Sequence, residues 1–462
     1  MLDITKASAL MISDAVRKRE VSAEEVCEYF IRVAEADKNG AYITVMEDTA
    51  LEAARCVDAM VKDGSTDLPL AGVPLSVKDN ICTAGVRTTC ASRFLEDFVP
   101  SYSATVYDRL IKAGAIPIGK TNMDEFAVGS DGTTSYFGKC TNPSDATHTP
   151  GGSSSGSAAS LVSGSAVVSL GSDTGGSARI PASFCGLTSL KPTYGSVSRY
   201  GLVGMAPSLE QICPMTHSVD DNKLLYNVIR GFDERDMTTY TSLGCKRRKR
   251  NSDKKLTIGV FLPKDATDIA VSAVSNASDY LKDAGHHLNC VALPYDEDIL
   301  GVYYTVSSAE VSSNLVRFDG IRYGYRSASG DITDARTEGF GTALRERLAE
   351  GAYVLSHNNG ATYVRALEIM EEVRREMLFL FEECDIILTP MTDETAPLFG
   401  KGFPNGDRYA VYANLSGCPA ISVTAKTDKN GFPIGVQLIG AHGEEDTVYR
   451  AAEIIEKGRC TL

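Results

Sequence analysis

The sequence lacks the features that mark membrane-spanning, exported and metal-binding proteins. No apolar run approaches the roughly 20 residues that a transmembrane helix needs. The opening stretch MLDITKASALMISDAVRKRE scatters charges through its apolar positions, unlike a signal peptide. The 12 cysteines form no C-x-x-C pair, so they suit neither a zinc site nor a dense disulfide framework. We therefore expect a cytoplasmic protein with no membrane contact, no metal site and mostly buried cysteines.

Basic residues are in deficit as well. The chain has 46 Lys and Arg residues against 60 Asp and Glu residues, a formal net charge of −14. A chain of this charge repels nucleic acid as a whole. The run KRRKR at 246–250 is an exception. We interpret it as a solvated surface loop; an auxiliary contact to RNA phosphates or a targeting signal are the alternatives.

Apolar residues recur alternately with helix and strand periodicity, which predicts an α/β fold. The first 60 or so residues have helical periodicity; Ser22 and Glu25 form a capping-box pattern, and Gly64 ends the next helix. The only candidate linker, 243–256, lies between strands that fit one sheet, so we expect a single domain. Further helices are predicted at 103–114, 268–282, 307–317, 362–383 and 445–457, and strands at 70–80, 115–121, 165–173, 256–261, 286–293, 385–390, 419–425 and 433–440.

One motif match is interpreted as accidental. GAIPIGKT at 114–121 fits the phosphate-loop pattern G-x-x-x-x-G-K-[ST]. That loop requires a strand before it and a helix directly after it. Here a helical segment precedes the motif, and Ile-Pro-Ile inside it is typical of a strand. We therefore do not expect ATP to bind at this motif.

Two loops rich in serine and glycine are candidates for a catalytic site. In GSDTGGSARIP, two glycines precede Ser177, so successive backbone N–H groups can point inward around it. Such donors stabilise an oxyanion by about 3–4 kcal/mol each. A plain Gly/Ser turn without chemistry is the alternative interpretation.

A nucleophilic serine needs a base, and the sequence offers no obvious histidine. His148 is the nearest one, but no acidic residue is evidently placed to orient it. A lysine that loses its solvent can serve instead, because desolvation lowers its pKa toward neutrality. Lys78 follows the apolar segment GVPLSV and is the candidate, with an ordinary surface charge as the alternative.

Together, GVPLSVKDN, PGGSSSGSAAS, GSDTGGSARIPASFCG and LKPTYG resemble the amidase signature family. The 24-residue spacing from Ser153 to Ser177 agrees with that family. The resemblance implies a large mixed β-sheet flanked by helices on both faces. It divides the single domain 1–462 into N-terminal helices (1–64), the signature core (65–230), a substrate-side region (231–395) and a C-terminal return to the sheet (396–462).

The resemblance also implies the catalytic roles. Ser177 is the nucleophile, Lys78 the general base, and Ser153 the bridging serine, in a loop with a cis peptide. The N–H groups of Thr174, Gly175, Gly176 and Ser177 form the oxyanion hole. Ser154 is the rival to Ser153, while Ser155 is expected only to support the loop. By analogy, Asp173 and Arg179 support the nucleophile.

Three further stretches, at 122–130, 208–221 and 303–324, resemble one branch of the family, the glutaminase subunits of aspartyl/glutamyl-tRNA amidotransferases. The resemblance covers about residues 20–455. It implies hydrolysis of glutamine to glutamate and ammonia, so that mischarged Glu-tRNA(Gln), and in some cases Asp-tRNA(Asn), is amidated. The implied partners are a tRNA-binding kinase subunit, which uses ATP and Mg²⁺, and a small third subunit that completes a heterotrimer. This chain would need no cofactor of its own.

Glutamine carries an α-carboxylate and an α-ammonium group, which suit an arginine and an acid. The resemblance places Arg347 and Asp407 at these two positions, with Tyr303 or Tyr304 lining the pocket. The sequence departs from the branch at 131–134 (DGTT) and at Asp393 and Glu394.

Other functions stay open on sequence alone. A stand-alone amidase for small or peptide amides is the first alternative. A catalytically silent interaction protein is the second, although the joint presence of Lys78, Ser153 and Ser177 disfavours it.

Overall fold

The computed structural model describes residues 3–65, 67–239, 254–403 and 406–460. The basic run at 246–250 and most of the candidate linker lie outside these ranges. Within them, eleven strands form one mixed sheet in the order β1-β3-β2-β4-β6-β5-β10-β11-β9-β7-β8. The predicted α/β fold with one large sheet is confirmed.

The strands are mostly short, and the central ones are buried. Their bounds are β1 Tyr42–Val45, β2 Pro74–Lys78, β3 Ile116–Thr121, β4 Val168–Asp173, β5 Thr188–Lys191, β6 Gln211–Thr216, β7 Thr257–Val260, β8 His287–Cys290, β9 Ile386–Pro390, β10 Ala420–Thr427 and β11 Pro433–Gly440. Each of the four predicted regions contributes at least one strand to this sheet. We propose on this basis that they fold as one domain.

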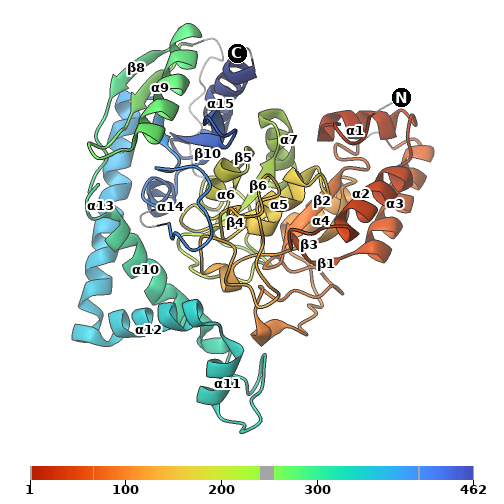
Figure 1. Cartoon of the computed structure of the whole chain (residues 1–462), viewed down its shortest axis with the longest axis horizontal. Helices are drawn as coiled ribbons and strands as arrows, with labels where there is room; N and C mark the ends of the chain where they lie inside the picture. The colour runs from red at the N-terminus through yellow and green to blue at the C-terminus, as the bar shows by residue number, and fades with distance from the viewer. Residues whose placement is uncertain (1–2, 66, 240–253, 404–405, 461–462) are drawn as a thin grey trace.

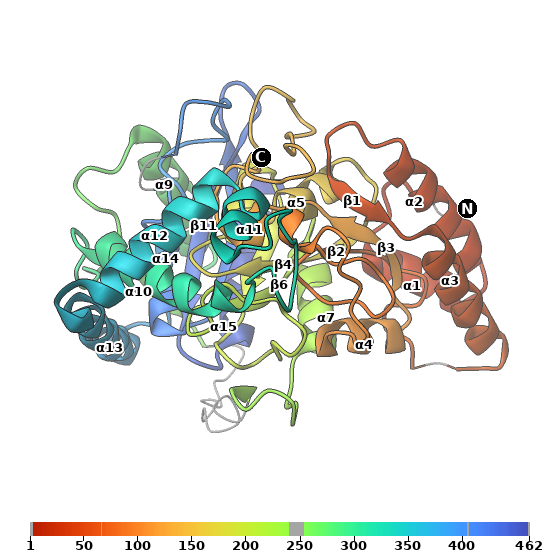
Figure 2. The ribbon, with the colours of Figure 1, turned by 90° about the horizontal axis from the view of Figure 1, so that it is seen from below.

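Helices cover both faces and both ends of the sheet (Figures 1 and 2). The N-terminal helices α1–α3 lie at one end, and α10, α12 and α13 lie at the other. The α-helix bounds are α1 Ala9–Arg17, α2 Ala23–Glu35, α3 Glu47–Lys62, α4 Thr105–Lys112, α5 Ser155–Val162, α6 Arg179–Phe184, α7 Val219–Ile229, α9 Asp268–Asp283, α10 Ile299–Asn314, α11 Ile332–Gly339, α12 Thr342–Ser356, α13 Ala361–Glu383, α14 Val411–Ser416 and α15 Glu445–Cys460. Single 3₁₀ turns are η1 Arg93–Leu95, η2 Glu125–Ala127, η3 Leu315–Arg317 and η4 His357–Gly360.

Alternation of side chains along the strands explains the two covered faces. Ile212 and Leu438 face the large core under α2, α4, α7, α9 and α15. Their neighbours Cys213 and Ile439 face the opposite side, where α5 and α6 or the α10–α14 layer cover them. Successive residues of a strand point to opposite faces, so a strand buried on both faces is apolar at consecutive positions.

The sheet brings the ends of two parallel strands to one place. β2 pairs with β4 in parallel, with Leu75 beside Val168 and Val77 beside Leu170. Lys78 at the end of β2 and Asp173 at the end of β4 therefore reach the same edge of the sheet. The loops that carry the candidate serines meet at this edge.

Local helix signals were reliable where capping residues are present. The Ser22–Glu25 capping box is formed, and Gly64 follows α3 in a left-handed conformation (φ +88°). The predicted helix at 307–317 is wrong in its bounds, because α10 begins at Ile299. The first half of α10, ILGVYYTVS, is rich in β-branched and aromatic residues, which have a weak helix propensity. Tertiary packing overrides this propensity. The helical N-terminus also contains a strand, β1, at the sheet edge.

The phosphate-loop match at 114–121 is a strand. Residues Ile116–Thr121 form β3, which is buried throughout and follows α4. The Lys120 ammonium donates to the Ile81 carbonyl and to Thr88 Oγ1, and it lies 3.4 Å from Asp79. The Lys120 ammonium is therefore bonded to groups inside the protein and is not available to a phosphate.

Candidate active site

Lys78 lies fully buried and in contact with both candidate bridging serines. Its Nζ lies 2.8 Å from Ser153 Oγ and 2.9 Å from Ser154 Oγ, with the Ser172 carbonyl at 3.4 Å. Burial lowers the pKa of Lys78 to about 7, although the carboxylates of Asp124 and Asp173 oppose the change. An amine of this pKa is substantially neutral at physiological pH and can accept a proton.

The two rival serines differ in their other contacts. Ser154 Oγ donates to the Ser172 carbonyl at 3.1 Å and accepts the Ser172 N–H at 3.3 Å, so it is tied to β4. For Ser153 Oγ, Lys78 is the only hydrogen-bond partner among the described residues. The Gly152–Ser153 peptide is cis, as the family resemblance implied. The geometry therefore favours Ser153 as the bridging serine and Ser154 as a structural one.

Residues 173–179, called the nucleophile loop after the predicted role of Ser177, are arranged around one buried carboxylate. Asp173 accepts the backbone N–H groups of Gly176, Ala178 and Arg179 at 3.0–3.3 Å. The Arg179 guanidinium donates to both Asp173 oxygens, at 2.9 and 2.7 Å, and both side chains are fully buried. Although burial opposes it, the Arg179 charge holds the pKa of Asp173 well below its usual range.

This arrangement leaves Ser177 partly exposed while its neighbours are buried. The Ser177 carbonyl accepts the Ser154 N–H at 3.0 Å, which joins the nucleophile loop to the Ser153 loop. Ser177 is therefore accessible from solvent, and Ser153 directly precedes the Ser154 that this hydrogen bond holds.

One of the four predicted oxyanion donors has an acceptor inside the protein. The Gly176 N–H donates to Asp173 Oδ1 at 3.0 Å, so it is not free for a substrate oxygen. The N–H groups of Thr174, Gly175 and Ser177 donate to no residue in the part of the chain that the structure describes. Three of the four predicted donors remain available.

The predicted substrate residues lie together beside this loop. Tyr304 donates its hydroxyl to Asp407 Oδ2 at 3.1 Å, and the Arg347 guanidinium lies 4.7 Å above the Tyr304 ring. Burial raises the pKa of Asp407 to about 6. Arg347 also donates to Ser308 Oγ at 3.1 Å. The Tyr304 side chain therefore contacts both an acid, Asp407, and an arginine, Arg347.

Tyr303 has a different place from Tyr304. It is buried against Gly175, where a Cβ built on the glycine would overlap the tyrosine hydroxyl. Tyr304 lines the Asp407–Arg347 cluster, whereas Tyr303 packs on the nucleophile loop. The two adjacent tyrosines thus connect the Asp407–Arg347 cluster to Gly175, two residues before Ser177.

Both departures from the family pattern lie close to the site. In the 131–134 loop, the N–H groups of Gly132 and Thr134 donate to the buried Asp124 carboxylate, at 3.1 and 3.3 Å. The second departure, Asp393, accepts the Tyr409 hydroxyl at 2.8 Å. Glu394 lies next to it in the same turn.

Sequence reasoning missed Asp124 and the partners of Arg179. Asp124 follows β3, its N–H donates to the Ser153 carbonyl at 3.2 Å, and a Cβ on Gly152 would overlap its carboxylate. Asn414 and Gln437 accept the Arg179 guanidinium from the distant C-terminal segment. An acid shortly after a buried strand was the available indication for Asp124; none existed for Asn414 and Gln437.

The chain matches known proteins over almost its whole length. A family model described as amidase matches residues 25–449. The A-type subunit of the Glutamyl-tRNA(Gln) amidotransferase of Carboxydothermus hydrogenoformans is 42% identical, covering 99% of this chain and 98% of the relative. A protein of the same description from Halothermothrix orenii is also 42% identical, covering 96% of both chains.

Solved structures agree with these relatives. The A-type subunit of the Glutamyl-tRNA(Gln) amidotransferase of Thermotoga maritima superposes with a TM-score of 0.79 at 32% identity, covering 99% of this chain and 96% of that one. A peptide amidase of Stenotrophomonas maltophilia gives a TM-score of 0.84 at 26% identity, covering 98% and 97%. No described helix is long and apolar enough to cross a membrane. A lysine–serine–serine constellation at the meeting point of β2 and β4, in a chain that matches the amidase model for most of its length, establishes that this chain belongs to the amidase family.

Proposed function

We propose that this chain is the glutaminase subunit of a tRNA-dependent amidotransferase, acting in the cytoplasm. The observation that carries the proposal is the buried Lys78–Ser153 contact beside Ser177, in a chain 42% identical over its length to an amidotransferase subunit of the A type. The Tyr304–Asp407–Arg347 cluster supports glutamine as the amide.

Acylation follows from the site geometry. Neutral Lys78 accepts the Ser153 proton as Ser153 takes the proton of Ser177, and Ser177 Oγ forms a bond to the glutamine side-chain carbonyl carbon. The N–H groups of Thr174, Gly175 and Ser177 stabilise the resulting oxyanion. When the C–N bond breaks, the proton returns from Lys78 through Ser153 to the leaving nitrogen. Ammonia leaves, and a glutamyl ester remains on Ser177.

Deacylation uses the same groups in reverse. A water molecule attacks the ester carbon and gives its proton through Ser153 to Lys78. The bond to Ser177 Oγ breaks, and Ser177 recovers a proton by the same path. Glutamate is released, and the neutral Lys78 amine is restored.

Asp407 and Arg347 select the substrate in this proposal. The Asp407 carboxylate receives the α-ammonium group, and the Arg347 guanidinium receives the α-carboxylate. Arg347 is held by the Tyr304 ring and Ser308, so its position is fixed before glutamine enters. Fixing such groups in advance reduces the entropy cost of binding.

The ammonia is consumed elsewhere in the assembly. The proposed partners are a tRNA-binding subunit, which uses ATP and Mg²⁺ and amidates mischarged Glu-tRNA(Gln) or Asp-tRNA(Asn), and a small third subunit. This chain needs no cofactor of its own in the proposal. Its net charge of −14 suits a subunit that leaves tRNA to its partner.

Ammonia release from glutamine, asparagine and a simple aliphatic amide tests the proposal. The isolated chain and the chain co-expressed with its partner subunits are compared, with Ser177→Ala as the blank. We expect glutamine turnover that rises with the partners and disappears in the blank. Equal turnover of the simple amide by the isolated chain would instead indicate a stand-alone amidase.

A further inference from the structure

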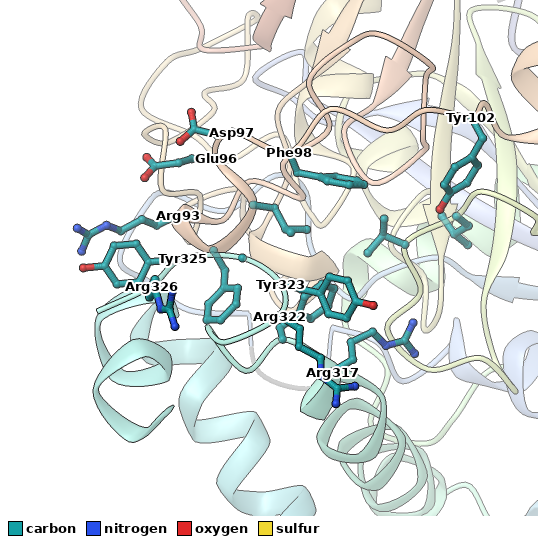
Figure 3. Close-up of a pocket in the computed structure, with 16 residues that line it drawn as sticks. Arg93, Glu96, Asp97, Phe98, Tyr102, Arg317, Arg322, Tyr323, Tyr325 and Arg326 are labelled. Carbon is teal, nitrogen blue, oxygen red and sulfur yellow. The ribbon is translucent and has the colours of Figure 1, made fainter. Parts of the chain in front are cut away.

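A cleft of about 690 Å³ lies between the η1 segment and the loop that follows α10. Phe94, Leu95 and Phe318 are buried at its base, and Leu202 and Val203 form one wall. Figure 3 shows Phe98 and Tyr102 on one side and Tyr323 with Arg317 and Arg322 on the other. The cleft is separate from the Lys78–Ser153 contact and takes no part in the proposed chemistry.

Large apolar side chains around this cleft are unusually exposed. Tyr323 is 61% exposed, Ile321 52% and Val316 67% on the loop side, and Phe98, Val99 and Tyr102 are exposed on the opposite side. Scattered apolar residues are normal on a protein surface, whereas several exposed ones beside one cleft indicate an interaction site.

Four arginines surround the same cleft: Arg93, Arg317, Arg322 and Arg326. None of them forms an ion pair with a carboxylate of the described residues. Arg93 lies 4.1 Å from the centre of the Tyr325 ring, and Arg317 donates to the Asn314 carbonyl. Only two carboxylates, Glu96 and Asp97, line the cleft beside them. In a chain of net charge −14, this is a local positive surface.

The cleft continues toward a second hollow. Leu202 and Arg317 line both the large cleft and a hollow of about 230 Å³ that includes Arg199 and Arg235. The second hollow is more polar, and its arginines are paired: Arg199 lies 3.8 Å from Glu210 and 3.9 Å from Asp236, and Arg235 lies 3.2 Å from Asp233. A groove that is apolar and arginine-lined in the large cleft and polar beyond it fits an extended polypeptide better than a small molecule. Tyr, Phe and Arg are also the residue types enriched at protein interfaces.

The groove lies close to the candidate active site. The Val203 N–H donates to the Asn80 carbonyl at 2.8 Å, and Asn80 is two residues after Lys78. Asn80 Nδ2 in turn donates to Ser172 Oγ at 3.0 Å. A partner held in the groove would therefore lie against the segment that ends β2, near the place where ammonia is released.

We infer that this groove docks an acidic segment of the tRNA-binding partner subunit, with an apolar side chain seated between Phe98 and Tyr323. The inference rests on the proposed function for the identity of the partner. Carboxylates of the segment pair with Arg317, Arg322 and Arg326. RNA fits less well, because the aliphatic side chains exposed beside the groove, Val99, Val316 and Ile321, offer nothing to phosphates.

Affinity for the purified partner subunit, measured at low and high salt, tests the inference. Arg317→Glu/Arg322→Glu/Arg326→Glu is compared with the charge-matched control Arg32→Glu/Lys282→Glu/Arg375→Glu, whose sites lie on α2, α9 and α13. We expect at least 100-fold weaker binding for the groove variant and less than threefold for the control. Tyr323→Ala should weaken binding about tenfold. Glutamine turnover by each isolated variant should be unchanged, which shows that the variants fold.

The outcomes separate the two proposals. If the wild-type chain does not bind the partner, the proposed function fails and this inference fails with it. If the wild type binds and the groove variant binds equally well, only the inference fails. Labelled tRNA is the second probe. Binding of tRNA by the isolated chain that the groove variant loses, with partner affinity unchanged, would overturn the inference in favour of an RNA site.

Discussion

Lys78 Nζ lies 2.8 Å from Ser153 Oγ inside a fully buried pocket, and the same amine lies 2.9 Å from Ser154. The two serines are nearly equidistant, yet only Ser154 is also bonded to Ser172. In the proposed mechanism, the remaining contacts of the two serines, and not their distances to the lysine, distinguish the hydroxyl that passes the proton.

Removal of each serine should therefore have a different effect. Ser153→Ala should lower kcat for glutamine by about 10²–10⁴-fold, the usual contribution of positioned proton transfer. Ser154→Ala should cost much less in kcat and more in stability, because Ser154 ties its loop to β4. Steady-state kinetics and thermal unfolding of both variants check this. A larger loss of kcat in Ser154→Ala than in Ser153→Ala would instead assign the bridging role to Ser154.

The pH dependence follows from Lys78 and Asp407. Lys78 acts as the neutral amine, so protonation below about pH 7 removes activity. Asp407 must be ionised to receive an ammonium group, and its pKa is about 6. Below about pH 6, kcat/KM for glutamine should fall more steeply than one decade per pH unit. A simple amide, which has no α-ammonium group, should fall by one decade per unit.

The Lys78→Arg variant tests whether the Lys78 amine causes this pH dependence. Arginine keeps the positive charge but does not lose its proton in proteins. Turnover should be abolished across pH 5–9, while binding of glutamine, measured calorimetrically, should persist. Recovery of activity at high pH in this variant would argue against lysine as the base.

The substrate residues should affect KM more than kcat. Asp407→Asn and Arg347→Met should each raise KM for glutamine by about 10–100-fold, as expected for loss of a charge-assisted hydrogen bond. Turnover of a simple aliphatic amide should not change. Indifference of glutamine KM to both substitutions would favour the stand-alone amidase.

The nucleophile loop should not tolerate a side chain at Gly175. In Gly175→Ala, the new methyl group would overlap Tyr303 and displace the oxyanion donors, so kcat should fall at least 100-fold. Gly301→Ala in α10 is the matched control, since its Cβ meets no atom within 4 Å. The control should keep full activity and gain slight stability from better helix propensity.

The buried Asp173–Arg179 pair should be essential for stability. Arg179→Met leaves Asp173 as an unpaired buried charge, which typically costs about 3–5 kcal/mol. Urea unfolding measures the loss. Arg55→Met, which breaks the exposed pair with Glu24, should leave the unfolding midpoint essentially unchanged. Equal midpoints for the two variants would contradict the assigned role of Arg179.

The sequence by itself proposed Lys78, Ser153 and Ser177 as the catalytic residues, because their flanking glycines and serines are local and resemble those of a known family. It also predicted the α/β sheet, since buried strands and amphipathic helices have distinct periodicities. The prediction from the sequence placed the start of α10 wrongly, because local helix propensity and tertiary burial disagree there.

Only the tertiary structure distinguished the contacts of Ser153 from those of Ser154, showed that the Gly176 N–H donates to Asp173 and gave Tyr303 and Tyr304 separate places. It alone brought Asp124 to the Ser153 loop and joined the η1 segment to the loop after α10 in an arginine-lined groove. These features depend on contacts between residues far apart in the chain. Local residue patterns do not encode which distant groups meet, because that is set by packing of the whole sheet and its helices.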